Sequence, residues 1–239
     1  MFRKKLAVLV AAALMSLTAS SAFAAFADLE LIRVYYDRSG AEIATDLGKV
    51  KDIIAAPTST FAGSFGGLTT GFVSYFALDR TTGVSQLWVS GVVNTPSTIV
   101  GGATGLTGLK SGTTNMYSLY NTMGGTNYTG LASATNSYKA KVSASQGTMA
   151  LAISNASRLN TEASLTSVLA GGSVTQSLYF WNNALTTVAA DKIGKSVATI
   201  TTNADGSTTV TTTPIPAAFY LMGSGLLGLV GLRRRNKVA

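Results

Sequence analysis

The chain has 239 residues, a net charge of +8, no cysteine and no histidine. The lack of cysteine excludes a disulfide framework, and the lack of histidine removes the commonest metal ligand and the usual general base of Ser and Cys triads. Seven of the 18 basic residues lie in the first five and last seven positions, so the body, 25–213, carries 11 basic and 10 acidic residues. A body with a net charge of +1 gives no sign of the basic face that nucleic acid requires. We therefore expect no nucleic-acid partner, no metal and no other cofactor.

The N-terminus has the three parts of a secretory signal peptide. The segment 3–5 is basic, the segment 6–17 is apolar but too short to span a bilayer core of about 30 Å comfortably, and Ala22 and Ala24 supply the small residues of a cleavage site. We expect export by the Sec machinery and removal of residues 1–24 by signal peptidase. Because the small-residue pattern repeats, cleavage after Ala27 is an alternative.

Two aromatic-rich segments predict β-hairpins. The first has strand-like runs at 29–36 and 41–47, and the second at 73–78 and 84–89. Each pair is separated by a turn that combines Asp, Arg, Ser or Thr, and Gly, residues that favour tight turns.

The middle of the chain is rich in Gly, Ser, Thr and Asn. The run 102–111 resembles a phosphate-binding loop, but Leu109 stands between the last glycine and Lys110, and the motif needs Lys directly after Gly. We interpret this run as a flexible glycine loop. Short helices are predicted at 116–123 and at 161–169, the second ended by Gly171 and Gly172.

The last part of the body returns to β-structure. A strand is predicted at 174–181, and the runs 196–202 and 207–213 flank the turn 203–206, which contains an Asp-Gly pair. The predicted fold class is mainly β, an antiparallel sandwich-like domain with one or two short helices. It would lie between the signal peptide and a C-terminal transmembrane helix.

The C-terminal tail, 214–239, combines prolines, an apolar segment and a basic cluster. The segment 215–232 has 18 residues without a charge, about 27 Å as a helix, which is just enough to cross a bilayer core. Its small residues Ser224, Gly225, Gly228 and Gly231 leave one face bare, which either permits close helix contact or reflects the frequency of glycine in membrane helices. The basic residues that would hold the C-terminus in the cytoplasm are Arg233, Arg234, Arg235 and Lys237.

This tail resembles the PEP-CTERM sorting tails, and it is most similar to the variant whose signature reads V-P-L-P-A-A-x-W-L. The matching residues begin with Pro214, Ile215, Pro216 and Ala217. Ile215 replaces the acid or Leu between the family's prolines, and Tyr220 stands where Trp is frequent. The resemblance covers about 25 residues, 214–239, and a simple membrane anchor without processing is the alternative.

The resemblance implies a Gram-negative protein that an exosortase, a membrane-embedded Cys transpeptidase, processes near the prolines. Members of this family are exported, reach the cell surface or extracellular space, and are often linked to exopolysaccharide and biofilm matrix. We therefore expect an inner-membrane intermediate followed by a surface or matrix protein that is not an enzyme.

Two other functions remain as alternatives. Aromatic rings stack on sugars, so a carbohydrate-binding module would use exposed members of the aromatic set Tyr35, Tyr36, Tyr75, Phe76, Trp88, Tyr179, Phe180 and Trp181, although burial in a β-core is favoured. A secreted hydrolase would need a carboxylate pair from Asp28, Glu30, Asp37, Glu42, Asp46, Asp52 and Asp79. Asp37 and Asp79 are interpreted as turn residues, and Glu30 and Glu42 as outward strand positions.

Overall fold

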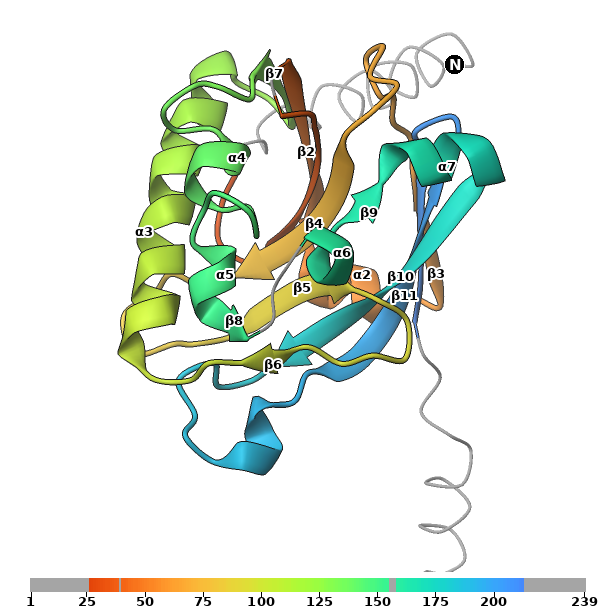
Figure 1. Cartoon of the computed structure of the whole chain (residues 1–239). Helices are drawn as coiled ribbons and strands as arrows, with labels where there is room; N and C mark the ends of the chain where they lie inside the picture. The colour runs from red at the N-terminus through yellow and green to blue at the C-terminus, as the bar shows by residue number, and fades with distance from the viewer. Residues whose placement is uncertain (1–25, 39, 155–157, 213–239) are drawn as a thin grey trace, which may run out of the picture.

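The computed structural model describes residues 26–38, 40–154 and 158–212, and Figure 1 shows a strongly curled sheet with helices packed around it. The strands are β1 (Glu30–Tyr36), β2 (Ala41–Lys49), β3 (Thr58–Phe61), β4 (Phe72–Leu78), β5 (Leu87–Gly91), β6 (Thr98–Ile99), β7 (Asn127–Leu131), β8 (Ile153–Ser154), β9 (Ala163–Ser164), β10 (Ser173–Trp181), β11 (Lys195–Asn203) and β12 (Thr208–Thr212). The α-helices are α2 (Val50–Ala55), α3 (Ala103–Tyr120), α4 (Tyr138–Lys141), α5 (Met149–Ala152), α6 (Arg158–Thr161) and α7 (Leu165–Gly171), with 3-10 turns η1 (Asn121–Met123) and η2 (Ala189–Lys192).

One antiparallel sheet contains ten of these strands. Its order is β3-β12-β11-β10-β5-β4-β1-β2-β7, with β9 paired to β4, while β6 and β8 form a separate pair. The prediction of a mainly β, antiparallel domain is confirmed. The three predicted hairpins are also present as β1–β2, β4–β5 and β11–β12.

Both faces of the sheet are covered, and each carries its own core cluster. On the first, which we call the α3 face, Ile32, Val34 and Tyr36 of β1 pack with residues of α3, α4 and α5. On the second, which we call the α2 face, Leu31 and Tyr35 pack with residues of α2 and α7. Successive strand residues point to opposite faces, so β1 is buried on both sides.

Helix α3 corrects the interpretation of 102–111 as a flexible loop. The helix begins at Ala103 and continues to Tyr120, so nearly the whole glycine run is helical. Gly105 and Gly112 lie where a side chain would collide with backbone, because a Cβ would come within 2.1 Å of the Leu151 oxygen and 2.5 Å of the Lys141 oxygen, respectively. Gly105 therefore permits close packing of α3 against α5, and Gly112 permits close packing against the end of α4, which offsets their low helix propensity.

The two short helices that the sequence predicted also differ from the structure. The segment 116–123 is the end of α3 followed by η1. The segment 161–169 is divided among α6, β9 and α7, and α7 begins only at Leu165. Gly172 does end α7, with φ of 77° in the left-handed region.

Candidate functional site

The residues of the predicted sorting machinery lie outside the described residues. This applies to the cleavage-site residues Ala22 and Ala24, to the motif Pro214 to Ala217, to the small residues 224–231 and to the basic cluster 233–237. Within the described part, no helix has the length and apolar character needed to cross a membrane.

Cleavage at the alternative site, after Ala27, would remove a residue of the hydrophobic core. Phe26 is buried on the α3 face, 4.8 Å from the ring centroid of Tyr120, and its backbone N–H donates to Asn121 Oδ1 at 2.8 Å. Cleavage after Ala27 would remove this core residue, whereas cleavage after Ala24 would keep it.

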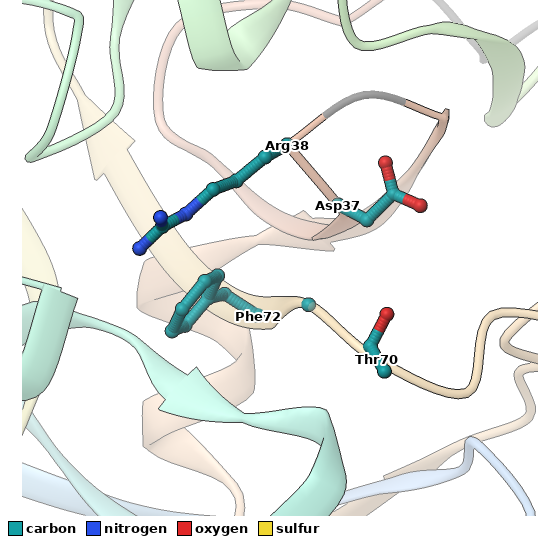
Figure 2. A pocket seen from close by; sticks show the side chains of 5 residues that line it. Asp37, Arg38, Thr70 and Phe72 are labelled. Atoms are coloured by element: carbon teal, nitrogen blue, oxygen red, sulfur yellow. The ribbon is translucent and has the colours of Figure 1, made fainter.

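A small pocket lies where β1 ends and β4 begins. It has a volume of about 250 Å³, and its lining consists of Asp37, Arg38, Thr70, Gly71 and Phe72. In Figure 2 the Arg38 side chain extends to the side of the pocket that holds the Phe72 ring, while the Asp37 carboxylate points the other way. Asp37 also caps its own turn by accepting a hydrogen bond from the Gly40 N–H, which confirms its turn role.

Behind the pocket, a carboxylate is buried among tyrosines. The Phe72 ring packs on Tyr36, with 5.9 Å between ring centroids. The Tyr36 hydroxyl donates a hydrogen bond to the Glu162 carboxylate at 2.7 Å, and the Tyr138 hydroxyl donates to the same carboxylate at 3.1 Å. Glu162 is only 4% exposed, so its carboxylate is part of the core of the α3 face rather than of the pocket surface.

A second buried carboxylate, Glu42, lies on the other side of Tyr138. It accepts hydrogen bonds from the Tyr120 hydroxyl at 2.7 Å, from the Tyr138 N–H at 2.8 Å and from the Lys139 N–H at 3.1 Å. Burial raises the pKa of Glu42, and these three donors oppose the rise. The expectation that Glu42 points outward is wrong, because helices α3 and α4 cover this face of β2. The alternation along a strand predicts to which face of the sheet a side chain points, but it does not predict whether another element covers that face.

Sequence reasoning did not place Glu162 in this cluster. Glu162 lies in the predicted helix 161–169, and its only other sequence signal is the scarcity of acids, since none occurs between 81 and 161. A lone acid in a Ser/Thr-rich segment is a weak signal. The contacts with Tyr36 and Tyr138 span 126 and 24 positions in the sequence, which a local pattern cannot show.

Glu30 and Asp46 form the one carboxylate pair that the structure brings together from the predicted hydrolase set, within the described residues. Burial and the neighbouring Glu30 raise the pKa of Asp46 to about 6, while the Gly48 N–H opposes this by donating to Asp46 at 2.8 Å. Lys49 Nζ lies 2.5 Å from Glu30 Oε1. Each carboxyl group has a local partner, Lys49 for Glu30 and the Gly48 N–H for Asp46, so both are engaged at the end of β2.

The remaining acids of the predicted hydrolase set either form local hydrogen bonds or ion pairs, or are exposed to solvent. Asp28 pairs with Arg80 at 2.6 Å, and Asp79 accepts a hydrogen bond from the Thr81 N–H at 2.8 Å, as expected of a turn residue. Asp52 is exposed on α2. No group of three or more acidic side chains with the geometry of a metal site occurs among the described residues.

The aromatic set lies in the core. Seven of its eight members are at most 2% exposed, namely Tyr35, Tyr36, Tyr75, Phe76, Trp88, Tyr179 and Trp181. Phe180 is half-buried and stacks on Trp88, with 4.5 Å between ring centroids. Neighbours such as Tyr35 and Tyr36 point to opposite faces, as expected, but both rings are buried because both faces are covered. The favoured core interpretation is confirmed, and these rings form no exposed stacking surface.

Comparison with known proteins identifies no relative of this chain. No protein-family model matches the chain, and neither a curated protein nor a solved structure matches it significantly.

Proposed function

We propose that this chain is an exported cell-surface or extracellular-matrix protein of a Gram-negative bacterium. Its tail inserts into the inner membrane, and an exosortase-type transpeptidase processes it near Pro214 and Pro216. The observation that carries this proposal is the order of three elements, a Pro-x-Pro motif, the uncharged segment 215–232 and the cluster 233–237, in a chain that begins with a basic and then an apolar segment. Both ends then specify the same topology, with the body outside the cytoplasm.

The body has a structural or adhesive role in this proposal, in contact with exopolysaccharide. Its charge is nearly balanced, and its aromatic rings and buried acids are engaged in its own core. Among the described residues, the pocket at the start of β4 has about 250 Å³, which is smaller than the roughly 300–1,000 Å³ of most small-molecule sites. The charge balance and the buried aromatic rings and acids favour a packed scaffold.

Mass spectrometry of the C-terminal peptide, from cells and from medium, tests the proposal. We expect a mature body that ends between Thr213 and Pro216 and lacks Arg233 to Arg235. An intact C-terminus in the membrane fraction would indicate a permanent anchor and contradict processing. An intact chain in the soluble fraction would contradict membrane insertion as well.

A proline pair in the same chain supplies a matched variant and control. Pro216→Ala changes the recognition motif, whereas Pro96→Ala changes a loop of the body between β5 and β6. We expect the unprocessed form to accumulate in the membrane for Pro216→Ala and not for Pro96→Ala. Equal processing of both variants would contradict a role for the prolines.

A further inference from the structure

Four of the nine exposed large apolar side chains of the described residues gather at one end of the sheet. They are Val100, Leu185, Val188 and Ile193, which we call the exit-end patch, and they are 36% to 57% exposed. Two segments far apart in the sequence hold them together. Thr98 bridges to Ile193, the Lys192 ammonium donates to the Val100 oxygen at 3.0 Å, and the Gly102 N–H donates to the Leu185 oxygen at 3.3 Å. Figure 1 shows this region at the bottom, where β6 lies beside the blue segment that contains η2.

The register of the sheet places this patch beyond the point at which β12 ends. Thr212, the last residue of β12, pairs with Ala198 of β11. Ile193 precedes Ala198 by five residues and has extended backbone angles. At about 3.3 Å per residue, Ile193 lies roughly 16 Å further along the direction in which β12 runs.

The short connection to the predicted membrane helix limits how far this end can lie from the bilayer. Ile215 is only three residues after Thr212, and three residues span at most about 10 Å. The headgroup region on each side of the hydrocarbon core is about 5–7 Å thick. With the tail inserted, the end of the sheet at Thr212 lies close to the membrane surface. The patch projects further in the direction of β12, so it meets the membrane when β12 runs toward the bilayer.

We infer that the exit-end patch is a membrane-contacting surface that inserts its aliphatic side chains into the headgroup–acyl boundary while the tail anchors the chain. This inference rests on the membrane insertion that we propose for the tail. Aliphatic side chains at the interface lose contact with water, and Lys192 and Lys195 lie within or beside the same segment, where ammonium groups meet lipid phosphates. Asp191 is the acid of that segment, so the apolar atoms carry most of the expected affinity.

The absence of cysteine from the chain makes a direct test possible. In the full chain, Val188→Cys and Leu131→Cys each provide one labelling position. These residues have similar exposed fractions, 57% and 63%, but Leu131 pairs with Ala41 at the opposite end of the sheet. Each variant carries an environment-sensitive fluorophore and is reconstituted into vesicles of phosphatidylethanolamine and phosphatidylglycerol, with and without bromine on the acyl chains. Vesicle flotation reports separately whether the tail has inserted.

We expect both variants to float, with at least a twofold loss of fluorescence in brominated vesicles for the label at position 188 and less than a tenth for the label at 131. Flotation with equally weak quenching at both positions would overturn the inference and leave membrane insertion intact, including the case in which a second copy covers the patch. Failure to float would overturn membrane insertion and the inference together. A second labelled pair, Leu185→Cys and Leu169→Cys, has exposures of 36% and 39% and guards against a local effect of either first substitution.

Discussion

Each face of the sheet buries an ionisable side chain, Glu42 on the α3 face and Arg33 on the α2 face. Neither side chain forms a salt bridge with another described residue. On the α3 face, Glu42 accepts one tyrosine hydroxyl and two backbone N–H groups. On the α2 face, Arg33 is 1% exposed and donates only to neutral oxygens. Around both Glu42 and Arg33, polar groups of the protein take the place of water, which lowers the cost of burying an ionisable side chain.

The hydrogen bonds of Arg33 and those of Glu42 connect different parts of the fold. Arg33 Nη1 donates to Gly206 O at 3.2 Å and Thr208 Oγ1 at 2.9 Å, and Nη2 donates to Ala62 O at 2.9 Å and Thr45 Oγ1 at 3.3 Å. These acceptors belong to β2, β12 and two loops, so Arg33 joins the first hairpin to the last. Glu42 instead joins β2 to its own cover, α3 and α4. The comparison suggests that the curl of the sheet depends on Arg33 and the helical cover on Glu42.

Replacing Arg33 should have the largest effect. Arg33→Leu removes all four hydrogen bonds from the buried guanidinium, and Gly206 O keeps only the Tyr35 hydroxyl as a donor. Because hydrogen bonds from a charged group are worth more than neutral ones, we expect the free energy of unfolding to fall by about 3–5 kcal/mol. The midpoint of urea unfolding, followed by the fluorescence of the buried Trp88 and Trp181, measures this. Arg38→Leu is the control, because Arg38 is exposed on the same hairpin, and we expect a change within about 0.5 kcal/mol. Similar losses for both variants would remove the assigned role of Arg33.

Helix α3 offers the next largest effect, on the opposite face. In Gly105→Ala the new methyl group would meet the Leu151 oxygen at 2.1 Å, so we expect a loss of about 2–3 kcal/mol from overpacking. In Gly108→Ala the nearest atom lies 3.5 Å away, in Thr148, and the higher helix propensity of Ala should raise stability by up to about 1 kcal/mol. Thermal unfolding of the two variants should therefore shift in opposite directions. Shifts of the same sign would contradict the close packing of α3 against α5.

Glu42→Gln probes the carboxylate alone. The amide keeps an acceptor oxygen for Tyr120 and Tyr138 but turns its NH₂ toward the Lys139 N–H, so we expect a loss of about 1–3 kcal/mol at pH 4. The folded-state pKa of Glu42 is raised above its unfolded value, so its contribution is greatest at low pH and falls as pH rises through the folded pKa. The difference between wild type and variant should shrink from pH 4 upward, as measured by urea unfolding at several pH values. A difference that grows with pH would show that the ionised form is the stabilised one.

Asp46 extends the comparison to a carboxylate that is only half-buried. Its pKa of about 6 lies above the usual value near 3.9, so the folded state loses stability as pH rises through the interval from about 4 to about 6. Asp46→Asn keeps an oxygen for the Gly48 N–H and should be more stable than wild type at pH 7 by about 1 kcal/mol, a value reduced for solvent screening. At pH 4 the two proteins should have equal stability. The absence of any change across this interval in chemical unfolding would contradict the raised pKa.

The hairpins could be predicted because their signals are local. The turn residues at 37–40 and 203–206 lie between β-favouring runs, and a turn fixes the register of the strands that it joins. The structure has both hairpins and the third one at β4–β5. Helix α3 could not be predicted in the same way. Its glycines usually favour loops, but Gly105 is required by the backbone of α5 and Gly112 by the backbone of α4, about 45 and 30 residues away in the sequence.

The sequence alone determined the β-class, the three hairpins and the assignment of the aromatic residues to a core, since strand propensity and turn chemistry act over a few residues. It is also the sole basis for the proposed export and sorting. Only the tertiary structure decided that both faces of the sheet are covered, that Glu42 and Arg33 are buried, and that four aliphatic side chains gather beyond the end of β12. These features depend on contacts between segments far apart in the chain, and whether a strand face is buried depends on what packs against it.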